Sequence, residues 1–136
     1  MSQANVEAAR RLYEARNRGD TEAVVAECHP QVEWHSYLSS LGGRPIRGHA
    51  GVRRYLRSLA EVWAEFRHEL EELVDAGDSV VSLLHIHAVG RASGVAVDMP
   101  IAHVLTFEGG RCIESVSYVD RSDALEAAGV REPAVA

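Results

Sequence analysis

The sequence contains no lysine and no block of basic residues, although it has 14 arginines. The only adjacent basic pairs, Arg10-Arg11 and Arg53-Arg54, occur in predicted helices of a chain whose net charge is −6. Binding to the phosphate backbone of nucleic acid requires clustered positive charge. We therefore expect no nucleic acid partner.

Cysteine and long apolar stretches are also scarce. The two cysteines, Cys28 and Cys112, lie in apolar surroundings without metal-ligand spacing, so we expect small core residues and no disulfide framework. No run is long enough to span a membrane, and residues 1–15 lack the apolar stretch of a signal peptide. We expect a cytoplasmic protein without a membrane partner.

Composition and hydropathy pattern indicate one globular domain over residues 1–136, with a disordered tail at 130–136. Apolar residues at three- and four-residue spacing predict helices, and apolar runs between turn residues predict strands. The predicted helices cover 4–18, 21–29 (ended by Pro30), 50–66 and 121–129. The predicted strands cover 31–37, 67–75, 79–90, 95–107 and 111–119, and residues 39–48 are interpreted as a loop.

This order, with helices first and hairpin-connected strands later, is typical of an α+β fold. We expect a curved, mostly antiparallel sheet that wraps around the N-terminal helices and leaves a cone with a pocket inside. The strand at 79–90 is apolar on both faces apart from its histidines, so it should be central and covered on both sides. The expected assembly is a homodimer through the outer face of the sheet.

Three histidines occur in the two predicted strands at 79–90 and 95–107. His85 and His87 are two residues apart and must point to the same side of their strand, whereas His103 lies between Ile101 and Leu105 on another strand. An imidazole in an apolar interior must be hydrogen-bonded, ligated or used. Desolvation would keep His103 neutral and able to act as a base. The alternative is a core histidine bonded to a backbone carbonyl or a tyrosine hydroxyl.

Several short segments occur in an order that resembles a known family. They are Arg18-Gly19-Asp20, His29-Pro30, Gly48, DAGDSVV at 75–81, FEGGR at 107–111 and YVDRSDALEAAG at 118–129. Together they resemble the SnoaL-like polyketide cyclases of the nuclear-transport-factor-2-like superfamily, which also holds the ketosteroid isomerases and the limonene epoxide hydrolases. The resemblance covers nearly the whole chain and implies a cystatin-like α+β barrel with an interior ligand pocket.

Family residues carry over only in part. His103 falls at the position of the histidine that assists catalysis in the cyclases, whereas their catalytic aspartate corresponds to Ser117. The ketosteroid isomerase positions hold Trp34, His103 and Leu12. The epoxide hydrolase positions hold His87, His85 and Ser117. None of these catalytic sets is intact, so we predict a variant of the pocket that is lined by histidines.

These observations predict a cofactor-independent acid–base enzyme that isomerises, cyclises, hydrates or hydrolyses a small apolar or aromatic metabolite. His103 is the expected acid–base group, with His85 or His87 as its helper. The expected ligand-binding residues are Trp34, Ser117, Tyr13, Leu56, Ile101 and Val119. The main alternative is a non-catalytic module that binds a small hydrophobic ligand, and a weaker one is a metal site on the three histidines.

Overall fold

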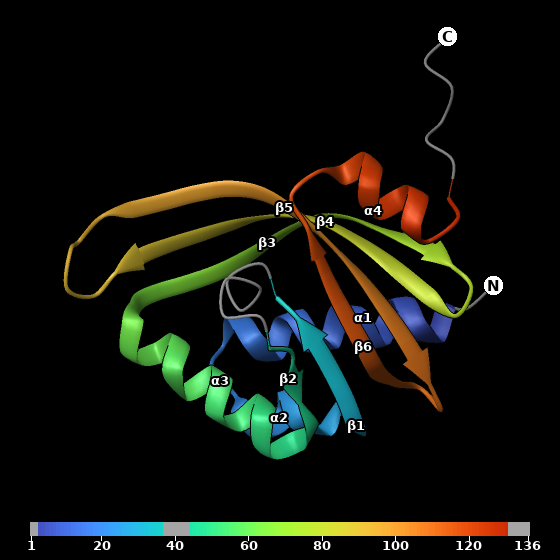
Figure 1. The fold of residues 1–136 in the computed structure, drawn as a ribbon, viewed down its shortest axis with the longest axis horizontal. Coiled ribbons are helices and arrows are strands. Elements are labelled where there is room, and N and C mark those ends of the chain that lie inside the picture. Colours follow the sequence, from blue (N-terminus) through green and yellow to red (C-terminus); the bar gives the residue numbers. More distant parts are fainter. Residues whose placement is uncertain (1–2, 37–43, 131–136) are drawn as a thin grey trace, which may run out of the picture.

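Figure 1 shows a curved sheet with helices on both of its faces, in a computed structural model that describes residues 3–36 and 44–130. The helices are α1 (Gln3–Asn17), α2 (Thr21–Ala26), α3 (Gly48–Val62) and α4 (Arg121–Ala127). The strands are β1 (Cys28–His35), β2 (Ile46–Arg47), β3 (Trp63–Ala76), β4 (Ser79–Gly90), β5 (Ala96–Glu108) and β6 (Arg111–Tyr118). The predicted α+β class is confirmed.

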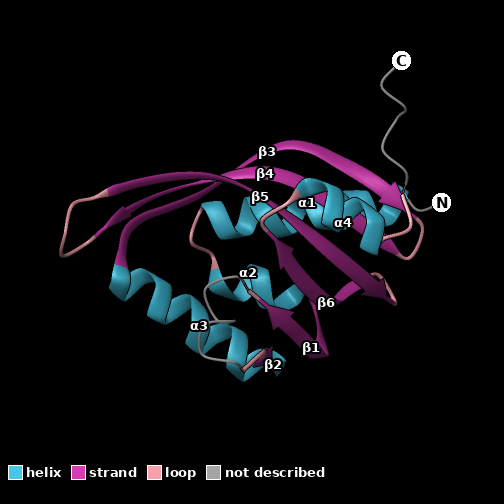
Figure 2. Ribbon diagram, turned by 45° about the horizontal axis from the view of Figure 1, so that its top comes forward, coloured by secondary structure: helices cyan, strands magenta, loops and turns pink. Residues whose placement is uncertain are grey.

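The strands form one sheet in the order β2-β1-β6-β5-β4-β3. β1 and β6 pair in parallel, and the other neighbours are antiparallel. The hairpin between β3 and β4 turns at Gly77, whose φ of 82° lies in the region that glycine adopts without strain. Figure 2 shows these two strands and β5 arching past α1, so that the sheet has a concave face toward α1 and a convex face away from it.

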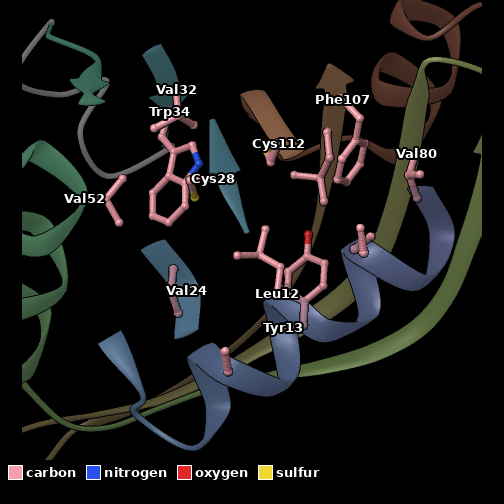
Figure 3. Packing of buried hydrophobic residues seen from close by; sticks show 14 of the residues in the cluster. Leu12, Tyr13, Val24, Cys28, Val32, Trp34, Val52, Val80, Phe107 and Cys112 are labelled. Carbon is pink, nitrogen blue, oxygen red and sulfur yellow. The ribbon is translucent and has the colours of Figure 1, made fainter. Parts of the chain in front are cut away.

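The main core fills the space between α1, α2, α3 and the concave face. On α1, Ala9, Leu12 and Tyr13 are buried at the predicted three- and four-residue spacing. Figure 3 shows Leu12 and Tyr13 projecting from this helix toward the sheet. Cys28 and Cys112 are unpaired and fully buried in the same core, as the sequence predicted.

The convex face is covered at one end by α4. Asp120 begins this helix, as predicted, because its carboxylate accepts a hydrogen bond of 2.8 Å from the Ser122 backbone N–H. The helix forms a second small core with the sheet, which contains Val81, Leu83, Ala102, Val104, Ala124 and Leu125. The homodimer through this face stays a prediction. Within the described residues, no helix combines the length and apolar character needed to cross a bilayer.

The helix predicted over 50–66 is shorter than expected. It ends at Val62, and Trp63 and Phe66 belong to β3. Their three-residue spacing fits a helix, but it also fits a strand with an irregularity, and pairing decides between the two. Trp63 lies opposite Gly90 and Phe66 opposite Ala88, with the register shifted between Trp63 and Glu65. The hydrogen bonds to β4 therefore override the helical pattern.

Two expectations for the N-terminal half are also wrong. The second helix ends at Ala26, and Pro30 lies inside β1. Proline is tolerated there because the register between β1 and β6 shifts between Cys28 and Glu33, where the ladder of hydrogen bonds is interrupted. The predicted loop contains the short strand β2. The part of that loop before residue 44, Tyr37 and the tail at 131–136 lie outside the described residues.

Candidate functional site

A cavity of about 250 Å³ lies between α1, α3 and the concave face of the sheet. Most of its wall is apolar, and a few polar side chains converge on it, which is the usual form of a small-molecule site. The lining residues are Leu12, Tyr13, Arg16, Trp34, Ser36, Tyr55, Trp63, Phe66, His68, Ile86, Ala88, Val97, Met99, Ile101, His103, Leu105, Ser115 and Ser117.

A hydrogen-bonded pair, Tyr13 and His103, forms the most polar part of the cavity. The Tyr13 hydroxyl and His103 Nδ1 are 2.7 Å apart, and the two rings are stacked with centroids 5.9 Å apart. His103 lies opposite Ser82 on β4 and Ser117 on β6, so pairing to both neighbours fixes its side chain on the concave face. His103 Nε2 has no hydrogen bond to any described residue. Nε2 is therefore the nitrogen that remains for a ligand.

Burial keeps both members of this pair uncharged. It lowers the pKa of His103 to about 3, and the positive charge of Arg16 adds to the effect. Burial also raises the pKa of Tyr13 above its usual value, and the nearby Ser82 hydroxyl partly offsets this. The Ser82 hydroxyl nevertheless forms no hydrogen bond with Tyr13, since Ser82 Oγ is buried without a partner among the described residues. At neutral pH the site thus presents a neutral imidazole.

A second buried imidazole, that of His68, lies beside this pair. Its ring centroid is 5.5 Å from that of Tyr13 and 6.1 Å from that of His103. Its Nδ1 is buried without a hydrogen-bond partner in the described part of the chain. Burial lowers the pKa of His68 well below its usual value, with Arg16 and His103 contributing in the same direction. The second imidazole of the site is therefore His68.

Asn17, at the end of α1, holds the backbone of β3 at this point. Its side-chain amide donates to the His68 carbonyl at 2.7 Å, and its side-chain oxygen accepts from the His68 N–H at 2.8 Å. β3 is the last strand in the sheet, so these backbone groups have no neighbouring strand to pair with. Asn17 therefore positions the second imidazole through its backbone.

Arg16 contributes the permanent positive charge to the cavity. Its guanidinium carbon lies 5.3 Å from the centroid of the Trp34 ring and 6.0 Å from that of Tyr55, within cation–π distance of both. Trp34 and Tyr55 meet edge to face at 6.0 Å. This part of the wall combines a half-buried cation with two flat aromatic surfaces.

Four of the six predicted ligand-binding residues line the cavity: Tyr13, Trp34, Ile101 and Ser117. The other two, Leu56 and Val119, are not among the residues that line this cavity. Leu56 packs from α3 against the main core beside the cavity. Val119 follows the end of β6, where the alternation of the strand no longer applies, and its side chain is 52% exposed.

The expected convergence of three histidines is wrong. His85 lies opposite Pro100 and His87 opposite Asp98, whereas Ser82 lies opposite His103. Because side chains alternate along β4, His85 and His87 are on the convex face and His103 is on the concave face. The sequence spacing shows that the first two share a face, but it does not show which face closes over the cavity. The metal set of three histidines cannot form.

On the convex face, the two histidines lie within a network of carboxylates. Asp98 bridges them, with 3.0 Å from Oδ1 to His85 Nδ1 and 3.0 Å from Oδ2 to His87 Nδ1. The other ring nitrogen of His85 is 2.8 Å from Glu71, and that of His87 is 3.4 Å from Glu69. The hydrogen bond from His85 lowers the pKa of the Asp98 carboxyl. The described residues include no group of three side chains arranged to hold a metal ion.

His68 and Arg16 are site residues that were not predicted from the sequence, although the pattern around each contains a signal. Phe66, His68 and Leu70 alternate with polar residues, and this spacing marks His68 as facing the same side as two apolar neighbours. Arg16 continues the buried stripe of α1 three residues after Tyr13. A charged residue in the apolar stripe of a helix is a signal of a polar site in the interior.

The curved, open sheet that packs over N-terminal helices around a cavity is the architecture of the nuclear-transport-factor-2-like proteins. The sequence model of the SnoaL-like domain matches residues 9–115, and the chain belongs to this family. No curated protein matches the chain.

Three solved structures illustrate the likeness. A nuclear-transport-factor-2-like protein of unknown function from Burkholderia pseudomallei is 28% identical over 93% of this chain and 97% of its own, with a TM-score of 0.78. TerC, co-crystallised with polyporic acid, is 24% identical over 93% of this chain and 99% of its own, with a TM-score of 0.76. A proposed polyketide cyclase from Xanthomonas campestris is 20% identical over 93% of this chain and 97% of its own, with a TM-score of 0.72. The last two, at these identities, establish the fold alone.

Proposed function

We propose that this protein is a cofactor-independent acid–base enzyme that acts on a small apolar or aromatic metabolite inside the cavity. The observation that carries the proposal is the pair of Tyr13 and His103, which places a neutral imidazole on the wall of an apolar cavity. The reaction class is the movement of a proton next to a carbonyl group, as in isomerisation or cyclisation. Two of the similar solved structures are described as proposed polyketide cyclases, which supports a reaction of the cyclase or isomerase type.

In the proposed reaction, His103 takes a proton from the carbon beside a substrate carbonyl. The proposed reaction uses the tautomer in which Nδ1–H donates to the Tyr13 oxygen, because this tautomer leaves the lone pair on Nε2 to accept the proton. The electron pair of the broken C–H bond moves onto the carbonyl oxygen and forms an enolate. The imidazolium then returns the proton at the far carbon of a conjugated double bond. Alternatively, the enolate carbon attacks a second carbonyl and closes a ring, and the alkoxide formed from that carbonyl takes the proton from the imidazolium. Tyr13 is a positioning residue, because it acts through the imidazole.

The low pKa of His103, about 3, makes the ring a weak base in the empty cavity. A negative charge that develops next to the ring in a water-poor cavity stabilises the imidazolium and raises this pKa as the reaction proceeds. Proton transfer is therefore favoured only with a substrate bound. Because of the same low pKa, the imidazole stays uncharged while the cavity is empty.

The size and lining of the cavity support a ligand of one or two rings. Its volume of about 250 Å³ lies just below the range of roughly 300–1,000 Å³ that is common for small-molecule sites. Trp34, Tyr55 and Phe66 offer flat apolar surfaces to such a ligand. TerC, which shares the fold, was crystallised with polyporic acid.

Proton exchange tests the proposal without knowledge of the natural substrate. The probe is 2-tetralone, a bicyclic ketone with acidic protons next to its carbonyl. In D₂O, NMR follows the loss of these proton signals with wild-type protein, with His103→Gln and with buffer alone. His87→Gln is the matched control, because it makes the same substitution on the convex face.

We expect wild-type protein and His87→Gln to exchange these protons at the same accelerated rate. We expect the exchange rate with His103→Gln to be about 10²- to 10⁴-fold lower, which is the usual contribution of a positioned base. Circular dichroism verifies that each variant is folded. Equal rates in His103→Gln and wild-type protein would contradict the proposed role of this imidazole.

A second candidate function is a binding module without catalysis. The observation in its favour is that no carboxylate is among the described residues that line the cavity. Imidazoles with strongly lowered pKa values can serve only as hydrogen-bonding groups in such a module. Saturable binding of 2-tetralone without any acceleration of proton exchange would favour the module over the enzyme.

A further inference from the structure

The contrast between two half-buried arginines carries a further inference about the ligand. Among the described residues, two arginines are half-buried, Arg16 and Arg121, and the other arginines are exposed. Arg121 has a carboxylate partner, since its Nη2 lies 2.7 Å from Glu71 Oε2. Arg16 has no ion pair with any described residue, and its guanidinium lines the cavity instead.

The surroundings of Arg16 make an unpaired positive charge unfavourable in free energy. The cavity wall that Arg16 shares is mostly apolar or aromatic, its serines are neutral, and its histidines are uncharged. A cation that is partly removed from water gains most from an anion at close range, because little solvent screens the attraction. The stacking with Trp34 and Tyr55 holds the guanidinium in place but does not neutralise it.

We propose that Arg16 is an anion-binding subsite, and that the ligand of this cavity is a flat aromatic molecule with a delocalised acidic oxygen group. A guanidinium offers parallel N–H donors that match two oxygens in one plane, which is the geometry of a carboxylate or an ionised hydroxyquinone. The aromatic part of the same ligand would lie against Trp34 and Tyr55. This inference rests on the proposed function, because it takes the same cavity as the ligand site, but it does not depend on turnover.

The subsite also has a consequence for the proposed reaction. Arg16 lies near enough to the site to lower the pKa values of His103 and His68, so its positive charge acts on the reacting region. An enolate formed there would be stabilised by the same charge. Arg16 therefore binds the acidic oxygens of the ligand, and its charge also favours the additional negative charge of the enolate over the unreacted substrate.

Calorimetric titration with matched probes tests the subsite. The anionic probes are 2-naphthoate, a carboxylate, and 2-hydroxy-1,4-naphthoquinone, an acidic enol, and the neutral probe is 2-naphthamide. The variants are Arg16→Gln, which removes the charge, and Arg16→Lys, which keeps it. The control is Arg11→Gln on the outer side of the same helix, where Arg11 pairs with Glu27 at 3.0 Å.

We expect wild-type protein and Arg11→Gln to bind at least one anionic probe about tenfold or more tightly than the amide. Arg16→Gln should lose this preference and keep its affinity for the amide, and Arg16→Lys should retain part of the preference. The anion that binds more tightly identifies the acidic group as a carboxylate or an enol. Equal affinity of wild-type protein for anions and amide, or an unchanged preference in Arg16→Gln, would overturn the subsite alone. The absence of binding by all three probes would overturn both the subsite and the proposed function.

Discussion

Mild acid should destabilise this protein through His103. The unfolded chain binds a proton at this residue below its ordinary pKa of 6.5, whereas the folded protein binds one only near pH 3, because the ring is buried. Between these two values the unfolded state holds more protons than the folded state. The free energy of unfolding is therefore highest above pH 6.5 and falls as the pH decreases toward 3.

The size of this effect follows from the linkage between protons and folding. One buried neutral histidine makes the free energy of unfolding fall by about 1.4 kcal/mol for each pH unit within this window. A decrease of about two pH units therefore costs about 2.7 kcal/mol, a large fraction of the roughly 5–15 kcal/mol of a typical domain. His68, whose pKa is also lowered by burial, acts in the same direction.

Urea unfolding at a series of pH values, followed by circular dichroism, measures this dependence. Carboxylates titrate in the same range, so the comparison is between wild-type protein and His103→Gln, in which those contributions cancel. We expect the free energy of unfolding of the variant to fall less steeply by about 1.4 kcal/mol for each pH unit. Equal slopes for the two proteins would refute the burial of a neutral imidazole at this position.

Two further predictions concern the groups that hold the site. Tyr13→Phe removes the partner of His103 Nδ1 and should cost about 1–3 kcal/mol in the free energy of unfolding by urea titration. The control is Tyr55, whose hydroxyl has no hydrogen bond to the described residues, so Tyr55→Phe should lower the free energy of unfolding by under about 0.5 kcal/mol. Equal losses in the two variants would contradict the hydrogen bond between Tyr13 and His103. Asn17→Ala leaves two backbone groups of β3 unpaired and should cost about 1–3 kcal/mol, clearly more than the exposed Gln3→Ala. A loss no greater than that of Gln3→Ala would mean that water replaces the Asn17 side chain.

Local sequence patterns predicted most of the secondary structure. The apolar stripe of α1, the long strands β4 and β5, and the cap at Asp120 follow from residue spacing and from the chemistry of single side chains. The patterns were less informative where two structures share one spacing. The end of α3 was misplaced because Trp63 and Phe66 satisfy a helical spacing as well as the bulged strand that pairs with β4.

The candidate site could be predicted only in part for a related reason. His103 and Tyr13 were named from the sequence, but their hydrogen bond joins residues that are 90 positions apart. His85 and His87 were placed in the cavity because both faces of β4 are apolar near its centre, so that hydropathy does not distinguish them. His68 was overlooked because its strand is otherwise rich in glutamate.

The sequence by itself determined the family, the α+β class and the presence of imidazoles on apolar strands, since these depend on short segments and their order. The tertiary structure decided which imidazoles meet. The pairing of Ser82 with His103 places one histidine inside, and the same alternation places His85 and His87 outside. The packing of α1 on the concave face then adds Tyr13 and Arg16 to the cavity. A strand has two faces with the same period, so only long-range pairing and packing can select the face that encloses the site.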